Sequence, residues 1–480
     1  MNKSIKKNTI LNILKTCSSI IFPLITFPYV SRILLPTNVG KVNFAQAYVN
    51  YYSLIATLGI ATYAIRSCAA IKEDKEKLSK TASELFSINL IMTFLSYAIL
   101  FFSLAFYKGI SNYRMLIVIE SSVIILTTLG ADWLNAAMED FLYITIRTVS
   151  FQFIALVLLL LFVKNQDDYV KYAIISVFSA SGANLINIWY RRKYCKIKFT
   201  LDINWKNHMR PIFFLFVMML SQTIFNNADT TMLGLMQNDF QVGLYSTAYK
   251  ITRIIGQVVQ SLSMVIIPRL SIYFANNDFE NANKFLKKVL GFNLTLGLPM
   301  VLGVIMLSNE IIFLVGGPEY MQAVPVIRIL ILSFMFSLVG GSFLGNAILI
   351  PMGKEKYYMI VCCITAAVNV FLNALLIPKY AAVGASISTA FNGFLIMAFL
   401  MINVDKRIKV NGIISLFFKP IIGCLVVVLC CLISSYIENV YLKTIVSVLS
   451  SVMLYGITQI ILRNDLVVDT LSNFKKILKK

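Results

Sequence analysis

Residues 153–163 read FIALVLLLLFV and residues 421–433 read IIGCLVVVLCCLI, and neither stretch contains a charged residue. Similar stretches recur along the chain, in which 58% of residues are hydrophobic and the mean hydropathy is +0.77. A helix of about 20 apolar residues crosses the bilayer core and satisfies its own backbone hydrogen bonds. β-Barrel spans would instead alternate in polarity over about ten residues. No segment alternates in this way, so the sequence predicts an all-α, polytopic integral membrane protein.

Fourteen separable apolar segments are long enough to be transmembrane helices. We place these spans at residues 10–31, 42–65, 84–107, 115–137, 145–163, 170–190, 211–236, 243–267, 287–307, 325–351, 357–377, 381–403, 413–436 and 443–462. The connections between them leave no room for a soluble domain. Because the number of spans is even, both termini are expected on the same side of the membrane.

The net charge of +21 is distributed by loop. Loops predicted on the side of the termini carry thirty Lys and Arg residues, whereas the opposite loops carry only Arg32, Lys41, Lys108, Arg114, Lys164, Lys171, Lys379 and Lys443. An excess of basic residues marks cytoplasmic loops, so both termini are predicted to be cytoplasmic. A nucleic-acid surface would need a folded basic face or tail. We therefore expect no nucleic-acid partner.

Several functional classes lack the residues that they need. The single histidine, His208, lies in a cytoplasmic linker, which argues against histidine-ligated metals and Ser-His-Asp catalysis. No P-loop motif occurs. The eight cysteines show no C-x-x-C spacing, and we interpret them as small buried side chains. The sequence therefore predicts neither an enzyme nor a bound cofactor or metal.

An internal repeat relates the two halves of the chain. The Val-Gly pair at residues 39–40, at the start of the second span, recurs at residues 242–243, at the start of the eighth. The same offset carries Arg66 onto Arg269. Six spans separate the copies, and an even number implies parallel repeats with a substrate path between them.

The repeat leads to a prediction of three parts. Residues 1–200 form an N-terminal six-helix bundle, and residues 201–410 form a second bundle of six helices. Residues 411–480 add two transmembrane helices and a basic cytoplasmic tail. The basic linker at residues 191–210 joins the two bundles.

Three longer runs resemble a known family. They are FPYVSRILLPTNVGKVNFAQAYVNYYSLIATLGIATYAIRSCA (residues 27–69), NADTTMLGLMQNDFQVGLYSTAYKI (residues 227–251) and GNAILIPMGKEKYY (residues 345–358). These runs are similar to the polysaccharide-transporter family, which includes the Wzx-type flippases of O-antigen and capsule assembly. That family shares a superfamily with the multidrug and toxin extruders. The resemblance covers essentially the whole chain.

The resemblance implies a flippase for undecaprenyl-pyrophosphate-linked oligosaccharide repeat units of O-antigen, capsule or exopolysaccharide. The cargo would move from the cytoplasmic to the outer leaflet of the bacterial plasma (inner) membrane by alternating access. The implied partners are this lipid-linked oligosaccharide, membrane lipid, and, as further candidates, the polysaccharide polymerase and other assembly proteins.

Two alternatives remain beside the flippase. A drug or cation antiporter of the same superfamily would favour acidic groups in its cavity, whereas this chain has no carboxylate in the centres of its first three helices. A membrane-embedded glycosyltransferase would need a substantial outer loop, and the outer connection at residues 308–323 is short.

A pyrophosphate-bearing cargo requires a polar and preferably cationic cavity, because unpaired charges are costly in hydrocarbon. Lys250 and Arg253 are three residues apart on the eighth predicted helix and therefore share a face. Asp229 lies at a similar depth on the seventh. We interpret the two cations as a substrate-binding site for pyrophosphate or acidic sugars, with Asp229 tuning the site or relaying a proton. The alternative is a charge pair that only joins the two helices.

Further candidates lie elsewhere in the spans. Lys15, near the inner side, either faces the cavity or reaches back to water. Asp132 and Glu120 are candidate proton carriers, although Asp132 is close enough to the inner end to be simply hydrated. Amides that suit sugar hydroxyls, or that join helices, are Gln46, Asn50, Gln222, Asn226, Asn227, Gln257 and Gln260.

Overall fold

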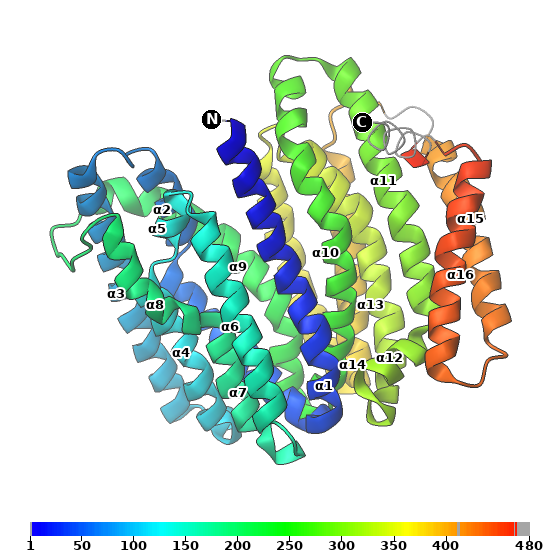
Figure 1. The fold of residues 1–480 in the computed structure, drawn as a ribbon, viewed down its shortest axis with the longest axis horizontal. Helices are drawn as coiled ribbons and strands as arrows, with labels where there is room; N and C mark the ends of the chain where they lie inside the picture. Colours follow the sequence, from blue (N-terminus) through cyan, green and yellow to red (C-terminus); the bar gives the residue numbers. More distant parts are fainter. Residues whose placement is uncertain (1, 410–412, 465, 468–480) are drawn as a thin grey trace. The chain divides into compact units, whose positions relative to one another are not determined.

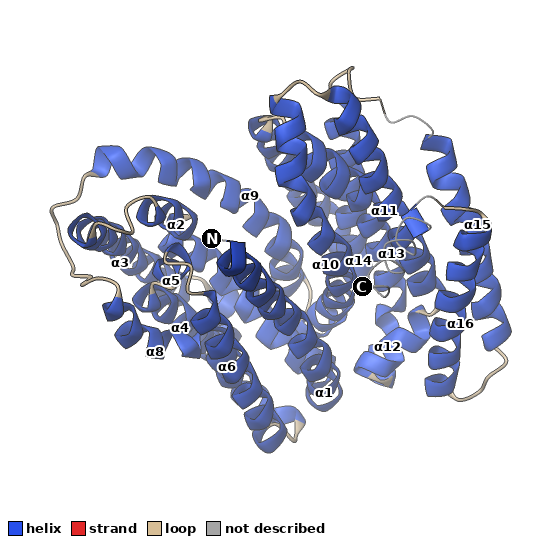
Figure 2. Ribbon diagram, turned by 45° about the horizontal axis from the view of Figure 1, so that its top comes forward, coloured by secondary structure: helices blue, strands red, loops and turns tan. Residues whose placement is uncertain are grey.

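The computed structural model describes residues 2–409, 413–464 and 466–467, with side chains except at 2–10, 12–16, 258, 260–266, 268 and 413–415. The α-helices are α1 (Asn2–Thr57), α2 (Ile60–Ala69), α3 (Lys75–Phe106), α4 (Arg114–Gly130), α5 (Trp133–Ala137), α6 (Phe141–Phe162), α7 (Tyr169–Val177), α8 (Ala183–Tyr190), α9 (Trp205–Met236), α10 (Asp239–Ala275), α11 (Phe279–Met306), α12 (Ser308–Gly316), α13 (Val324–Ser337), α14 (Glu355–Ile402), α15 (Ile413–Ser434) and α16 (Val440–Ile461). Short 3-10 or π helices are η1 (Lys108–Tyr113), η2 (Gln166–Asp168), η3 (Phe178–Gly182), η4 (Arg191–Lys193), η5 (Pro318–Ala323) and η6 (Leu338–Leu349). No strand occurs in the described ranges (Figure 2), so the all-α prediction is confirmed.

Eleven helical segments of the described chain are long and apolar enough to cross a membrane. Two of them, Cys17–Ala69 and Glu355–Ile402, each cover most of two predicted spans. A non-helical residue interrupts each of these two segments, Leu35 in the first and Ala381 in the second. The eighth predicted span lies in α10, which is not among the eleven. The polytopic architecture is confirmed, and the count of fourteen stays a prediction.

The chain divides into two compact units, Met1–Gly243 and Leu244–Lys480. The first unit contains α1 to α9, and the second contains α11 to α16. Helix α10 belongs to the second unit from Leu244 onward. The predicted division into bundles at residues 1–200 and 201–410, with an addition at 411–480, remains a prediction.

In the first unit, α1 packs against α3, α4, α6 and α9 (Figure 1). A core between α2, α3 and α5 contains Ile60, Leu85 and Trp133, all of which are buried. Aspartates begin two of these helices: the Asp74 carboxylate accepts the Lys77 N–H at the start of α3, and Asp140 accepts the Tyr143 N–H before α6. Such N-caps satisfy backbone donors that the helix itself cannot pair.

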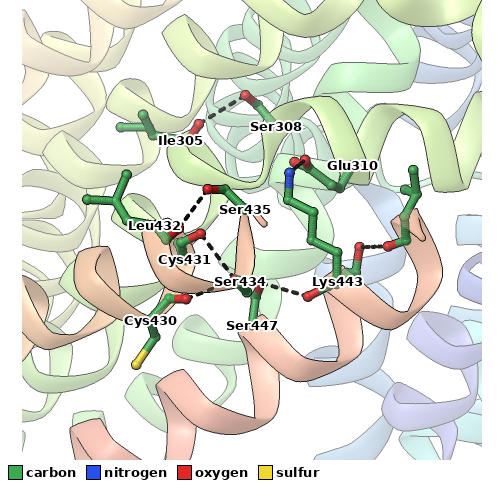
Figure 3. Close-up of polar contacts among 12 residues, drawn as sticks. Ile305, Ser308, Glu310, Cys430, Cys431, Leu432, Ser434, Ser435, Lys443 and Ser447 are labelled. Carbon is green, nitrogen blue, oxygen red and sulfur yellow. Dashed lines mark hydrogen bonds and ion pairs between the residues drawn. The ribbon is translucent and has the colours of Figure 1, made fainter. Parts of the chain in front are cut away.

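In the second unit, α13 packs against α14, and the α15–α16 pair packs on α11. The core between α11, η6 and α14 is built from buried aliphatic side chains, including Leu286, Leu294 and Ile348. Helix α16 also contacts α12, where Lys443 Nζ lies 2.6 Å from Glu310 Oε1 (Figure 3). The two C-terminal helices are therefore held to the rest of their unit by both apolar and ionic contacts.

Candidate functional site

A buried carboxylate joins three helices of the first unit. Glu120 on α4 is only 4% exposed. Its Oε1 accepts hydrogen bonds from Gln46 Nε2 on α1 and from Ser176 Oγ on α7, each at 3.1 Å. Gln46 Nε2 also donates to Ser176 Oγ (3.2 Å). An ionisable group at membrane depth is costly unless it is hydrogen-bonded. Gln46, which is a predicted site residue, therefore belongs to a hydrogen-bonded cluster with Glu120 and Ser176.

The same stretch of α1 carries a second set of polar contacts. Asn50 Nδ2 donates to Asn227 Oδ1 on α9 (3.0 Å). The hydroxyl of Tyr52 forms hydrogen bonds with the Tyr48 hydroxyl (3.1 Å) and with Ser103 Oγ on α3 (3.0 Å). The contact between Asn50 and Asn227 links two helices, which is one of the two roles considered for these amides.

Helix α9 exposes polar side chains within a membrane-length segment. Gln222 and Asn226, four residues apart and therefore on one face, are both exposed, whereas Asp229 is buried. Amides in the middle of a span face water or protein rather than hydrocarbon. Asn226 thus presents an exposed amide on this face of α9, and the buried Asp229 lies about one turn further along the helix.

Helix α10 presents cations in the second unit. Arg253 is exposed and Lys250 is half-buried. Their spacing of three residues places them on one face of the helix, as predicted. Asp229 belongs to the first unit and Lys250 to the second. The predicted pairing of Asp229 with Lys250 therefore stays a prediction.

Asp132 forms an ion pair with a residue that the sequence did not suggest. Arg147 Nη2 donates to Asp132 Oδ1 at 2.6 Å, and Asn135 Nδ2 donates to the same oxygen at 3.0 Å. The Arg147 side chain is 5% exposed. Arg147 lies near the start of the predicted span at residues 145–163. The sequence alone therefore assigns its charge to the neighbouring cytoplasmic loop. The side chain of Lys15, another candidate, lies outside the described residues.

Several buried polar groups in the second unit were also missed by the sequence reasoning. On α14, Asn373 Nδ2 donates to Asn369 Oδ1 (3.2 Å), and Asn392 is fully buried. The Tyr245 hydroxyl of α10 lies 3.2 Å from Thr389 Oγ1 of α14. Two asparagines four residues apart within an apolar span were the signal that could have revealed the first of these contacts. These groups give the interior of the unit hydrogen-bonding capacity at membrane depth.

Comparison with known proteins assigns the family. The model of the family described as "Polysaccharide biosynthesis protein" matches residues 5–274. The chain belongs to this family. The MatE family model also matches residues 215–375. Family membership confirms the resemblance on which the sequence interpretation depends.

Two relatives of the chain align over nearly their whole length. A protein of Shigella dysenteriae named "Putative O-antigen transporter" is 24% identical over 400 residues, which cover 82% of this chain and 99% of the relative. A protein of the same name from Escherichia coli (strain K12) is 20% identical over 412 residues, covering 84% of this chain and 97% of the relative.

A solved structure shares the fold. The inward closed structure of the lipid II flippase MurJ has a TM-score of 0.75 and 16% sequence identity, covering 96% of this chain and 99% of MurJ. At this identity the likeness concerns the fold alone. The eleven membrane-length helices, the family and this fold together make the chain a multi-pass membrane protein.

Proposed function

We propose that this family member is a flippase that translocates lipid-linked oligosaccharide repeat units across the membrane by alternating access. The observation that carries the proposal is the exposure of Arg253, a permanent cation, in the interior of helix α10, which contains the eighth predicted span. A guanidinium at this depth requires water or an anionic ligand, because hydrocarbon offers it no partner. A pyrophosphate-linked sugar is a ligand of matching charge.

The roles proposed for the candidate residues follow from the chemistry of the cargo. Its polyprenyl tail stays in lipid, while the pyrophosphate and sugars cross along polar groups. In this scheme Lys250 and Arg253 bind the anionic part, and Asn226 and Gln46 offer hydrogen bonds to the sugars. Lys15 adds a cation near the inner side, and Asp229 and Asp132 are candidates for coupling transport to an ion gradient. No covalent step is needed, so the protein acts as a transporter and not as an enzyme.

The proposal includes a location and partners. The excess of basic residues in one set of loops supports a plasma-membrane protein with both termini in the cytoplasm. The cargo is an undecaprenyl-pyrophosphate oligosaccharide for O-antigen, capsule or exopolysaccharide, which includes lipopolysaccharide biosynthesis. A polymerase and other assembly proteins would receive it at the outer leaflet.

The sidedness of the lipid-linked oligosaccharide tests this function. Spheroplasts of the native host, with and without the gene, are treated with a membrane-impermeant glycosidase or lectin. We expect the cargo to be inaccessible without the protein and accessible after complementation. Unchanged accessibility in the deletion strain would refute the flippase function for that cargo.

The cationic site is tested by substitution in the same assay. We expect Lys250→Ala and Arg253→Ala to reduce flipping at normal protein abundance, while Lys379→Ala, which removes an exposed charge outside this face, leaves flipping unchanged. If Lys250 and Asp229 serve only to join helices, each single variant loses abundance and the double variant regains it. That outcome would remove both residues from the substrate site.

A drug or cation antiporter is the second candidate function, which the MatE match over residues 215–375 favours. The same spheroplasts separate the two functions when they are loaded with a fluorescent cationic dye. Efflux that depends on this protein, without a change in oligosaccharide sidedness, would support the antiporter. The Arg253 cation argues against the antiporter function, because a positive charge repels cationic cargo.

A further inference from the structure

The segment that connects α8 to α9 is fixed to the first unit. Ser83 Oγ and Ser87 Oγ of α3 accept hydrogen bonds from the backbone N–H groups of Lys198 (3.1 Å) and Thr200 (2.9 Å). Glu84 Oε2, between these serines, accepts the Asn204 N–H at 3.3 Å. Three backbone donors of an irregular segment are thus satisfied by one face of a single helix. Figure 2 shows this segment as the long loop that precedes α9.

A histidine anchors the far end of the segment. His208 Nε2 lies 2.9 Å from Glu84 Oε2, and His208 Nδ1 lies 3.0 Å from the Tyr63 hydroxyl. His208 and Glu84 are both buried. With Cys195 buried and Ile197 and Ile203 packed on the core of α2, α3 and α5, the segment is held along its length.

The hydrogen bonds also set the depth of the segment. Ser83 and Ser87 are one helical turn apart, about 6 Å along α3. The predicted span begins at residue 84, so we expect these serines at the cytoplasmic edge of the hydrocarbon. The chain therefore moves toward the membrane core between Lys198 and Thr200 and returns to the level of Glu84 by Asn204.

Large apolar side chains point outward at this depth. Phe199 is 52% exposed, Leu201 is 75% exposed and Trp205 is 42% exposed. Further along α3, Phe94, Phe101 and Phe102 are exposed as well. A purely apolar exposed face on a spanning helix is the face that lipid covers. Exposed Phe199 and Leu201 beside that helix are suited to the boundary between headgroups and acyl chains.

Basic side chains accompany these apolar ones. Lys196, Lys198 and Lys206 are exposed, and Asp202 is the one acidic residue between them. We propose that residues 196–206 form a docking surface for anionic lipid headgroups, with Phe199, Leu201 and Trp205 inserted below the headgroups and the lysines bound to phosphate. The surface fixes the first unit to the membrane at the point where the chain passes into α9. The proposal is independent of the transported substrate.

Quenching of Trp205 fluorescence tests the surface. The full-length protein is reconstituted in phosphatidylcholine nanodiscs that contain a small fraction of lipid brominated on its acyl chains, either phosphatidylglycerol or phosphatidylcholine. The signal of Trp205 is the difference between the native chain and Trp205→Phe, because Trp133 and Trp189 contribute equally to both. We expect stronger quenching by brominated phosphatidylglycerol than by brominated phosphatidylcholine at the same fraction.

A matched pair of variants separates charge at this surface from charge in general. Each lysine at an anionic surface contributes about fivefold in affinity, so Lys196→Gln with Lys198→Gln should lower the preference for phosphatidylglycerol about 25-fold. Lys75→Gln with Lys80→Gln removes two exposed charges from α3 and should leave the preference unchanged. Size-exclusion profiles confirm that all variants are folded.

Two outcomes would overturn the proposal. Equal quenching by both brominated lipids would show apolar insertion without recognition of anionic headgroups. Absence of Trp205 quenching in any bilayer would show that the surface does not meet lipid, as expected if it binds a protein partner instead.

Discussion

At the scale of the residue, the repeated glycines Gly40 and Gly243 are explained by close backbone contact. A Cβ built on Gly40 would overlap the carbonyl oxygen of Asp239, and one built on Gly243 would overlap the carbonyl oxygen of Pro36. The Gly40 Cβ would also lie 2.9 Å from the backbone nitrogen of Gly243. The glycines recur at corresponding positions because the first unit brings these two backbones together there, leaving no room for a side chain.

Alanine at either glycine should therefore destabilise the protein. Overpacking of this kind costs about 1–3 kcal/mol, and backbone atoms on the other side of the contact have little freedom to move. We expect Gly40→Ala and Gly243→Ala to lower the midpoint of thermal unfolding in detergent. Gly303→Ala, on α11 with no atom within 4 Å of the added Cβ, is the control and should not. Normal stability of both repeat variants would contradict the close contact.

Asp140, outside the spans, makes stability depend on pH. Burial alone would raise the pKa of its carboxyl, but hydrogen bonds from the Tyr194 hydroxyl (2.5 Å), the Tyr190 hydroxyl (2.7 Å) and the Tyr143 N–H hold it below the ordinary value of 3.8. Because the pKa of Asp140 is lowered in the folded protein, the carboxylate stabilises the fold at pH values above its pKa in the unfolded chain. This contribution is lost as the pH falls through the pKa of the folded protein.

Asp140→Asn should accordingly destabilise the protein by about 1–2 kcal/mol at pH 7, because charge-assisted hydrogen bonds are replaced by neutral ones. The difference in the free energy of unfolding between Asp140→Asn and the native chain should shrink once the pH falls below about 4. Unfolding in detergent between pH 7 and pH 3.5 measures this difference. The control is Asp202→Asn, which changes an exposed carboxylate. A difference that does not change with pH would contradict the assigned role of the charge.

At the scale of the element, the C-terminal helix pair depends on one ion pair as well as on apolar packing. Lys443 of α16 and Glu310 of α12 are 21% and 10% exposed in their side chains, so the pair is largely desolvated. Nearby, Ser434 and Ser447 form a short hydrogen bond between α15 and α16 (Figure 3). The sequence places these two helices outside the repeat, and these contacts attach them to the second unit.

Removal of one partner should cost more than removal of both. A charge left unpaired in a buried site costs up to about 3–5 kcal/mol, whereas an apolar pair of similar volume is often neutral. We expect Lys443→Met and Glu310→Leu to destabilise singly, and the double variant to recover most of the loss. Thermal unfolding of the four proteins gives the coupling energy, and additive losses would refute a specific pair.

The break inside α14 provides a second prediction at this scale. Ala381 has φ 47° and ψ −127°, a conformation that favours glycine. Strain of this type costs about 1–3 kcal/mol in a residue with a Cβ. Ala381→Gly should therefore stabilise the protein by about 1 kcal/mol, whereas Ala390→Gly in the interior of the same element should destabilise it. A loss of stability in both variants would mean that Ala381 is not strained.

At the scale of the whole molecule, topology is the property that the loop charges predict. Reporter fusions test it: a reporter that is active only in the cytoplasm should be active after residue 464 and inactive within residues 164–168, between two predicted spans. This result would place the C-terminus on the inner side, and an even number of spans then places the N-terminus on the same side. An exported C-terminal reporter would contradict both the predicted span count and the predicted orientation.

The sequence by itself determined the fold class, the membrane location and the family, because long uncharged helices and recurrent motifs are local properties of the chain. It also identified Gln46, Asn226, Lys250 and Arg253 as polar groups in apolar surroundings. It could not identify their partners: Glu120 meets Gln46 and Ser176 only because α1, α4 and α7 pack together.

The tertiary structure alone decided the remaining contacts. Arg147 appears in the sequence as a loop cation, yet packing buries it against Asp132. The linker has the sequence of a basic, hydrophilic connection, yet Ser83 and Ser87 hold its backbone against α3. The physical reason is the same in both cases. Hydrogen bonds and ion pairs between residues distant in sequence depend on which helices lie side by side, and apolar periodicity does not specify that arrangement.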